Sequence, residues 1–231
     1  MNITLALPLY GPYNLFLGSR FGAVDLRHPI ATVIPGVNGV VLGVLAATFE
    51  PLTGSEIARL SGGRVSQSSV SRVLPEMVQL GIVAAQPAGR AILYRLNRDH
   101  VAAGAILRAA SLRDELFARM TAATTAWAIE PVAVWVFGSA ARDAGSSDSD
   151  IDVIVVRDEQ IDADDPLWNE QLTGLAGWVQ SWSGNGCDLL EYTPSELWAL
   201  VAAGDALVQA LLNDAITLAG ERPSVLLRRV G

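Results

Sequence analysis

Apolar side chains in the first half of the chain recur at the three- and four-residue spacing of helices that bury one face. This pattern predicts three helices, which cover residues 37–47, 55–60 and 66–80. Thr53 stands three residues before Glu56, the spacing of a capping box, so we expect the second helix to begin there. Gly81 is placed to end the third helix.

Strand signals follow these helices. The runs 82–85 and 91–96 are rich in apolar residues, and a Gln-Pro-Ala-Gly turn lies between them, which predicts a β-hairpin. The second half then alternates the two signals. Strands are predicted at 132–137, 151–156 and 187–191, and helices at 168–182, 195–203 and 206–218. The expected fold class is α+β, a helix-and-hairpin domain followed by a small mixed sheet with flanking helices.

These elements divide the chain into four stretches. Residues 1–28 are rich in Gly, Pro and aromatic residues and receive no role. We assign residues 29–100 to the helix-and-hairpin domain, 101–127 to a connecting helix and 128–231 to the domain with the sheet.

Charge separates the two halves of the chain. All 16 basic residues are Arg. Residues 1–122 hold 11 Arg and 7 Asp or Glu, a net charge of +4, whereas residues 123–231 hold 5 Arg and 17 Asp or Glu, a net charge of −12. The two values sum to the −8 of the whole chain. Such asymmetry indicates two modules with different partners.

Composition excludes several kinds of site. The single cysteine, Cys187, excludes a disulfide framework, and His28 and His100 lack the spacing of metal ligands. The longest uncharged stretch, between Arg27 and Glu50, is interrupted by Pro and Gly residues. We therefore expect a buried helix rather than a membrane span, and a cytoplasmic protein.

The segment LTGSEIARLSGGRVSQSSVSRVLPEMVQLGIV, followed by AGRAILYRLNRDH, resembles a bacterial winged helix-turn-helix regulator. In that geometry the third helix enters the major groove of duplex DNA and the hairpin tip contacts the backbone or minor groove. The third helix and the hairpin tip both carry side chains with hydroxyl, amide or guanidinium groups. Such groups hydrogen-bond phosphates and base edges. The candidate DNA-binding residues are Arg64, Ser66, Gln67, Ser68, Ser69, Ser71, Arg72 and Arg90, with further phosphate contacts from Arg95 and Arg98.

Pro75 departs from that pattern, because a proline well inside the third helix removes a backbone hydrogen bond and should kink it. An alternative is that the domain serves dimerisation or other protein contacts. A homodimer is therefore a possible assembly.

The segment VWVFGSAARDAGSSDSDIDVIVV carries the sharpest chemical signal in the chain. A predicted strand ends at Gly138-Ser139, ten residues follow, and Asp150-Ile151-Asp152 opens the next strand. Side chains two apart on a strand share a face, so both carboxylates can reach one site. Such oxygen ligands suit Mg²⁺ or Mn²⁺, and a pair of them can help hold two ions about 3.5–4 Å apart for nucleotidyl transfer.

Two further features extend this signal. The Gly-Ser turn lets backbone N–H groups approach phosphates. Asp188, on the predicted strand CDLLEY, supplies a third carboxylate that would complete a metal shell and accept the proton of an attacking hydroxyl.

The Gly-Ser turn, the D-x-D pair and the later Asp are together similar to the DNA polymerase β nucleotidyltransferase superfamily, above all its minimal members in bacterial toxin–antitoxin modules. The likeness covers about residues 125–222, with GDALVQALLNDAITLAG similar to their closing helix. It implies an NTP such as ATP, two divalent ions and transfer of NMP to a hydroxyl. Gly138, Ser139 and Arg142 would bind the triphosphate, and Asp150, Asp152 and Asp188 would bind metal and carry catalysis. Asp143 stands where members often have glycine.

The leading hypothesis is a DNA-binding protein whose Mg²⁺-dependent nucleotidyltransferase domain modifies a protein, RNA or small-molecule acceptor, in a module of the toxin–antitoxin kind. The alternative is a transcriptional regulator whose nucleotidyltransferase-like domain only senses nucleotide. A third interpretation makes the N-terminal domain a protein-contact module that delivers substrate. Expected partners are duplex DNA, an NTP and the acceptor, with no membrane.

Overall fold

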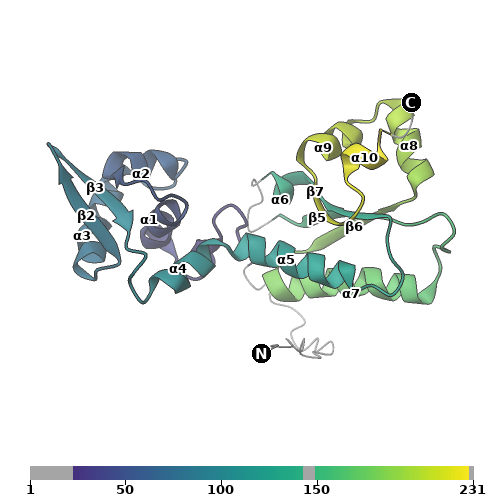
Figure 1. The fold of residues 1–231 in the computed structure, drawn as a ribbon, viewed down its shortest axis with the longest axis horizontal. Coiled ribbons are helices and arrows are strands. Elements are labelled where there is room, and N and C mark those ends of the chain that lie inside the picture. The colour runs from purple at the N-terminus through teal and green to yellow at the C-terminus, as the bar shows by residue number, and fades with distance from the viewer. Residues whose placement is uncertain (1–22, 143–148, 229–231) are drawn as a thin grey trace.

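The computed structural model describes residues 23–142 and 149–228, which form two units joined through α4 and α5 (Figure 1). The prediction of an α+β fold is confirmed, since the described residues combine ten α-helices with a three-stranded and a four-stranded sheet. Asp143 and residues 1–22 lie outside the described residues.

The N-terminal unit packs helices against a small antiparallel sheet with the strand order β1-β3-β2. Its core is formed by residues such as Val41, Leu45, Ile57, Val70 and Leu74. The elements of this unit are the 3-10 helix η1 (Pro29–Thr32), α1 (Gly36–Ala46), β1 (Leu52–Thr53), α2 (Gly54–Leu60), α3 (Gln67–Gln79), β2 (Val83–Ala88), β3 (Ala91–Leu96) and α4 (Ala103–Ala110).

Local side-chain chemistry sets the helix starts in this unit. The capping box predicted at α2 is present: the Thr53 hydroxyl accepts from the Glu56 N–H at 3.3 Å, and the Glu56 carboxylate accepts from the Thr53 N–H at 2.7 Å. Ser66 caps α3 by accepting from the Ser69 N–H at 3.2 Å. Pro75 lies inside α3 without ending it; its side chain is exposed, whereas Leu74 is buried.

Two helices occupy the stretch where one connecting helix was expected over residues 101–127. α4 ends and α5 (Leu112–Thr125) begins at Ser111. The break follows from packing, because Ile106 of α4 lies in the core of the N-terminal unit whereas Met120 of α5 lies in the core of the second unit.

The C-terminal unit is built on a mixed four-stranded sheet with the order β6-β5-β4-β7, in which β5 and β6 are parallel and the other pairs antiparallel. α5 and α7 cover one face, and α8 to α10 cover the other (Figure 1). Besides α5, its elements are β4 (Ala133–Val136), α6 (Gly138–Ala141), β5 (Ile151–Val156), α7 (Pro166–Ser183), β6 (Cys187–Tyr192), α8 (Pro194–Ala203), α9 (Ala206–Asp214), β7 (Ile216–Gly220) and α10 (Pro223–Leu226).

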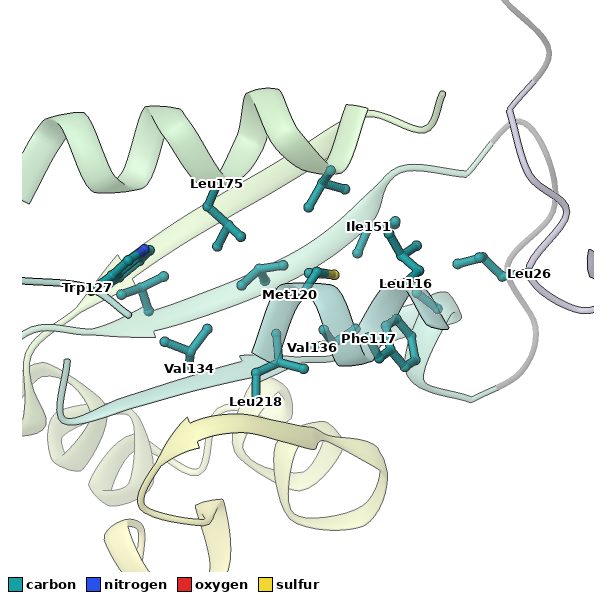
Figure 2. Packing of buried hydrophobic residues seen from close by; sticks show 14 of the residues in the cluster. Leu26, Leu116, Phe117, Met120, Trp127, Val134, Val136, Ile151, Leu175 and Leu218 are labelled. Carbon is teal, nitrogen blue, oxygen red and sulfur yellow. The ribbon is translucent and has the colours of Figure 1, made fainter. Parts of the chain in front are cut away.

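The core under α5 and α7 also receives a residue that precedes the N-terminal unit. Figure 2 shows Leu26 beside Leu116 and Ile151, and its side chain is 2% exposed. The Val24 N–H donates to the Ser183 carbonyl at 2.9 Å. Val24 and Leu26 are thus part of the C-terminal unit's packing.

The helix predicted over residues 206–218 is wrong at its end. α9 stops at Asp214, Ala215 is extended, and Ile216–Gly220 forms β7 against β4. The open edge of β4 supplies backbone partners that a longer helix would leave unpaired.

Among the described residues no single helix is long and apolar enough to span a membrane, and the α8–α9 pair, bent by 111°, meets that test by length and composition alone.

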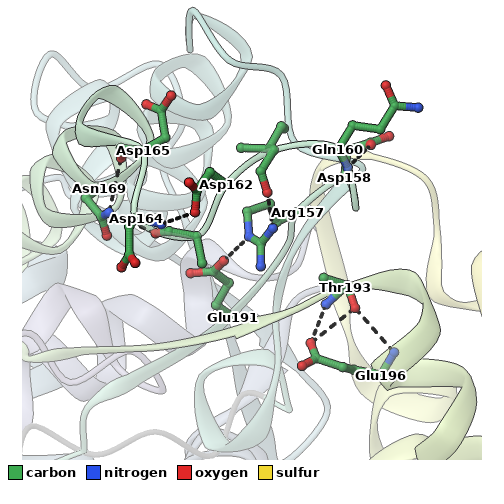
Figure 3. A network of polar contacts seen from close by, with 12 residues as sticks. Arg157, Asp158, Gln160, Asp162, Asp164, Asp165, Asn169, Glu191, Thr193 and Glu196 are labelled. Carbon is green, nitrogen blue, oxygen red and sulfur yellow. Dashed lines mark hydrogen bonds and ion pairs between the residues drawn. The ribbon is translucent and has the colours of Figure 1, made fainter.

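Several carboxylates of the acidic loop between β5 and α7 accept hydrogen bonds from nearby backbone N–H groups (Figure 3). Asp165 caps α7 by accepting from the N–H groups of Leu167 and Trp168, and Asp162 accepts from the Asp164 N–H at 3.0 Å. Arg157 bridges Glu191 and the Ile161 carbonyl. These contacts give Asp162, Asp165 and Glu191 a role in the structure of the loop.

Thr53→Ala removes one half of the α2 capping box. We expect it to lower the free energy of unfolding of the N-terminal unit by about 1 kcal/mol, because a backbone N–H loses its acceptor. Urea unfolding followed by circular dichroism measures this. Ser71→Ala, an exposed hydroxyl within α3, is the control, and an equal effect in both variants would contradict the role of the cap.

Candidate active site

The parallel pairing of β5 with β6 brings two predicted site residues together. Asp152 and Asp188 are direct register partners, so their side chains leave the same face of the sheet side by side. Asp152 is half-buried and Asp188 is exposed. The site therefore lies at the start of both strands, open to solvent on the side of β6.

Gly138 places backbone directly against Asp152. The chain leaves β4, the Phe137 N–H donates to the Asp152 carbonyl at 3.0 Å, and Gly138 follows with φ at +66°. A Cβ at position 138 would overlap Asp152 Oδ2 and lie 3.2 Å from its Cγ. Only glycine combines this conformation with this approach. Ser139 and Ala140 continue from it into α6.

A second glycine cradles Asp150. A Cβ at Gly186 would overlap Asp150 Oδ1, and the Gly186 carbonyl accepts from the Ile151 N–H at 2.9 Å. Asn185, which is 2% exposed, donates from Nδ2 to the carbonyls of Ser149 at 3.1 Å and Val24 at 3.3 Å. Asn185 was not among the predicted site residues, although its position between two glycines just before the Asp188 strand is a signal for a tight turn.

Electrostatics reflect the convergence of the carboxylates. Burial raises the pKa of Asp152, the charges of Asp188 and Asp150 raise it further, and Arg142 opposes the shift. Burial, with the neighbouring aspartates, also raises the pKa of the Cys187 thiol to about 12. Cys187 is therefore protonated at neutral pH, which favours a packing role over one as a nucleophile.

Arg142 has a partner that the sequence did not predict. Its Nη1 lies 3.4 Å from the Asp214 carboxylate at the end of α9, and both side chains are partly exposed. Arg142 also follows α6 directly, with its N–H donating to the Gly138 carbonyl at 3.3 Å. Arg142 thus lies close enough to Asp152 to lower its pKa, but its ion pair is with Asp214 of α9.

The donor set has the chemistry of a divalent-cation site. Asp150, Asp152 and Asp188 offer hard oxygen ligands, and a cation would relieve the repulsion that raises the pKa of Asp152. Within residues 23–142 and 149–228, however, no group of three or more His, Cys, Asp or Glu side chains is placed so that it could hold a metal ion. The case for a divalent-cation site therefore rests on the oxygen ligands of these residues and on the pairing of Asp152 with Asp188.

A comparison with protein-family models finds a match in this region. Residues 123–176 match the family Polymerase beta, Nucleotidyltransferase. No curated protein and no solved structure matches the chain. The match covers β4, α6, β5 and the first part of α7, and so includes Gly138, Ser139, Arg142, Asp150 and Asp152, while Asp188 lies beyond it.

Outside the nucleotidyltransferase match, the predicted DNA-contacting residues lie on the N-terminal unit. Most are exposed and Ser69 is half-buried; the exposed ones are Arg64, Ser66, Gln67, Ser68, Ser71, Arg72, Arg90 and Arg95. The Ser66 hydroxyl is hydrogen-bonded to those of Ser68 and Ser69 at 2.8 and 2.9 Å. This explains part of the serine run as helix capping.

Arg98 has a structural role. Its Nη2 donates to the carbonyls of Ala46 at 3.0 Å and Thr48 at 3.2 Å, and its guanidinium lies over the ring of Phe49. Arg98 thus pairs with carbonyls at the C-terminal end of α1, whereas a phosphate contact was predicted for it.

Gly138→Ala forces a Cβ into Asp152 and an L side chain into the left-handed region. We expect the free energy of unfolding to fall by about 1–3 kcal/mol, because the strain and the overlap act together. Urea unfolding measures the change.

Gly177→Ala is the matched control, since a Cβ at this helical position of α7 meets open space. It should raise the free energy of unfolding by about 0.5–1 kcal/mol. A neutral Gly138→Ala would show that Gly138 and Asp152 do not approach as described.

Proposed function

We propose that the C-terminal unit transfers a nucleoside monophosphate from an NTP to a hydroxyl acceptor. The observation that carries the proposal is the juxtaposition of Asp152 with Asp188 on one side and with the Gly138 backbone on the other. The family match over residues 123–176 supports the same class of chemistry.

The reaction assigns a role to each group. The acceptor oxygen attacks the α-phosphorus of the NTP, and a new P–O bond forms as the bond to the pyrophosphate oxygen breaks. Pyrophosphate leaves with that electron pair, and the hydroxyl proton passes to the Asp188 carboxylate. Asp188 is the exposed member of the pair, so an acceptor can reach it from solvent.

Asp152 and Asp188, the register pair, would hold the divalent cations. Asp150 would have to move toward them to take part, because the three carboxylates do not form a metal-binding group in the described structure. Mg²⁺ bound there would neutralise charge on the phosphates and on the leaving pyrophosphate. Gly138 and Ser139 would lie against the triphosphate, and Arg142 would exchange its contact with Asp214 for one with phosphate. The acceptor would be a protein, an RNA or a small molecule.

The N-terminal unit would bind duplex DNA as a winged helix, with α3 in the major groove and the β2–β3 hairpin against the backbone. The exposed side of α3, which carries Gln67, Ser71 and Arg72, supports this assignment, as does Arg90 at the hairpin tip.

The same exposed face of α3 favours a second candidate function. In it the protein is a DNA-binding regulator, and the C-terminal unit binds nucleotide without transferring it. The two candidates share the nucleotide site and differ only in the chemical step.

Asp152→Asn separates binding from chemistry. The variant should stay folded without metal, because replacing Asp152 removes a repulsion with Asp188 and Asp150. For the wild type, Mg²⁺ at about 100 times its dissociation constant should add about 2.7 kcal/mol to the free energy of unfolding, and the variant should lose this gain. Thermal unfolding with and without Mg²⁺ measures it.

Transfer itself is measured with α-labelled ATP, GTP, CTP and UTP in cell extract, by following label into macromolecules and small products. Wild type should label an acceptor and release pyrophosphate, and Asp152→Asn should not. Binding without transfer by the wild type would favour the regulator, and equal transfer by both proteins would remove the proposed site.

Arg72→Ala and Arg90→Ala test the DNA assignment. Each should weaken binding to duplex DNA, and loss of a phosphate contact at Arg90 should lower the slope of log affinity against log salt by about 1. Arg72→Ala should also change sequence preference. Fluorescence anisotropy across a salt series measures both.

Arg119→Ala is the control, because this exposed Arg on α5 is paired with Glu115 at 2.8 Å. If wild type binds no duplex from its own upstream region at low salt, the N-terminal unit is a protein-contact module.

A further inference from the structure

Arg113 links α5 to α6 across a long sequence separation. It is the second residue of α5, yet its guanidinium reaches the last carbonyls of α6. Nη2 donates to the carbonyls of Ala140 and Ala141, both at 2.9 Å, and Nε donates to Ala140 at 3.3 Å. The ring of Phe117, which is buried in the core, lies 4.9 Å from the guanidinium carbon.

α6 depends on contacts of this kind. It has only four residues, and so short a helix has no stability of its own in water. Its final carbonyls also lack partners within the helix. A planar, charged fork satisfies two of these carbonyls at once and places positive charge at the negative end of the helix.

The position of α6 decides the geometry at Asp152. Gly138 begins α6 and is the residue whose backbone lies against the Asp152 carboxylate. A shift of α6 away from α5 would therefore move Gly138 and open this contact. No comparable consequence follows from Arg119, which lies on the same helix and pairs with Glu115.

We infer that Arg113 is a positioning residue, which holds α6 so that Gly138 stays packed against Asp152. Its effect on nucleotide rests on the proposed function, whereas its effect on α6 does not. Because α5 begins directly after the break at Ser111, this contact also stands where the chain arrives from the N-terminal unit.

Amide hydrogen exchange of the full chain without nucleotide tests the contact with α6. In Arg113→Ala, exchange in residues 138–142 should accelerate about tenfold, the equivalent of about 1.4 kcal/mol, while exchange in residues 151–156 stays unchanged. Arg113→Lys should give an intermediate rate, because an ammonium group is a point charge without the fork. Arg119→Ala should match wild type.

Calorimetric titration with Mg²⁺ and each of ATP, GTP, CTP and UTP tests the consequence. Arg113→Ala should bind the preferred nucleotide about tenfold more weakly, as expected for the loss of charge-assisted hydrogen bonds that preorganise a site, and Arg119→Ala should not.

The outcomes are distinguishable. Unchanged exchange at 138–142 in Arg113→Ala, or acceleration spread equally over 151–156, would overturn the positioning role. Faster exchange with unchanged nucleotide affinity would overturn it as well, since α6 would then move without affecting the site. If wild type binds none of the four nucleotides, the proposed function fails, and the exchange data alone decide whether Arg113 holds α6.

Discussion

Strand pairings on both sides of β5 bring Gly138 and Asp188 to the Asp152 carboxylate. Antiparallel pairing places Val136 opposite Val153, so the chain leaving β4 must turn over Asp152. Parallel pairing places Asp188 on the other side of the same residue. The Asp152 carboxylate is therefore flanked by a backbone turn and a second carboxylate. Burial, and then the charges of Asp188 and Asp150, raise its pKa. Small displacements of either neighbouring strand would change the site.

Local chemistry made part of this structure predictable. The α2 capping box, the start of α3 and the strands at residues 133–136 and 151–156 follow from spacing and composition within a few residues. The pair of carboxylates and the Gly-Ser turn were visible for the same reason, because they are close in sequence. The nucleotidyltransferase resemblance has support from the family match, whereas the metal, the DNA and the acceptor stay predictions.

The features that escaped prediction depend on distant partners. Residues 206–218 have a helical composition, yet the free edge of β4 takes Ile216–Gly220 as a strand. The helix break at Ser111 reflects two separate cores, which no local pattern reports. Arg113 and Asn185 act through carbonyls 27 or more residues away. An arginine or asparagine met in a sequence carries no sign of which distant carbonyl it will satisfy.

The burial of Leu26 has a consequence for the order in which the protein folds. Leu116 and Ile151, which Figure 2 shows beside it, lie more than 80 residues later in the chain. On a ribosome, the N-terminal unit has all its core residues early and can fold as soon as they emerge. Leu26 must wait until the strands of the larger sheet have been synthesised. During that interval Leu26 lacks the core that buries its side chain, and completion of the C-terminal unit ends this exposure.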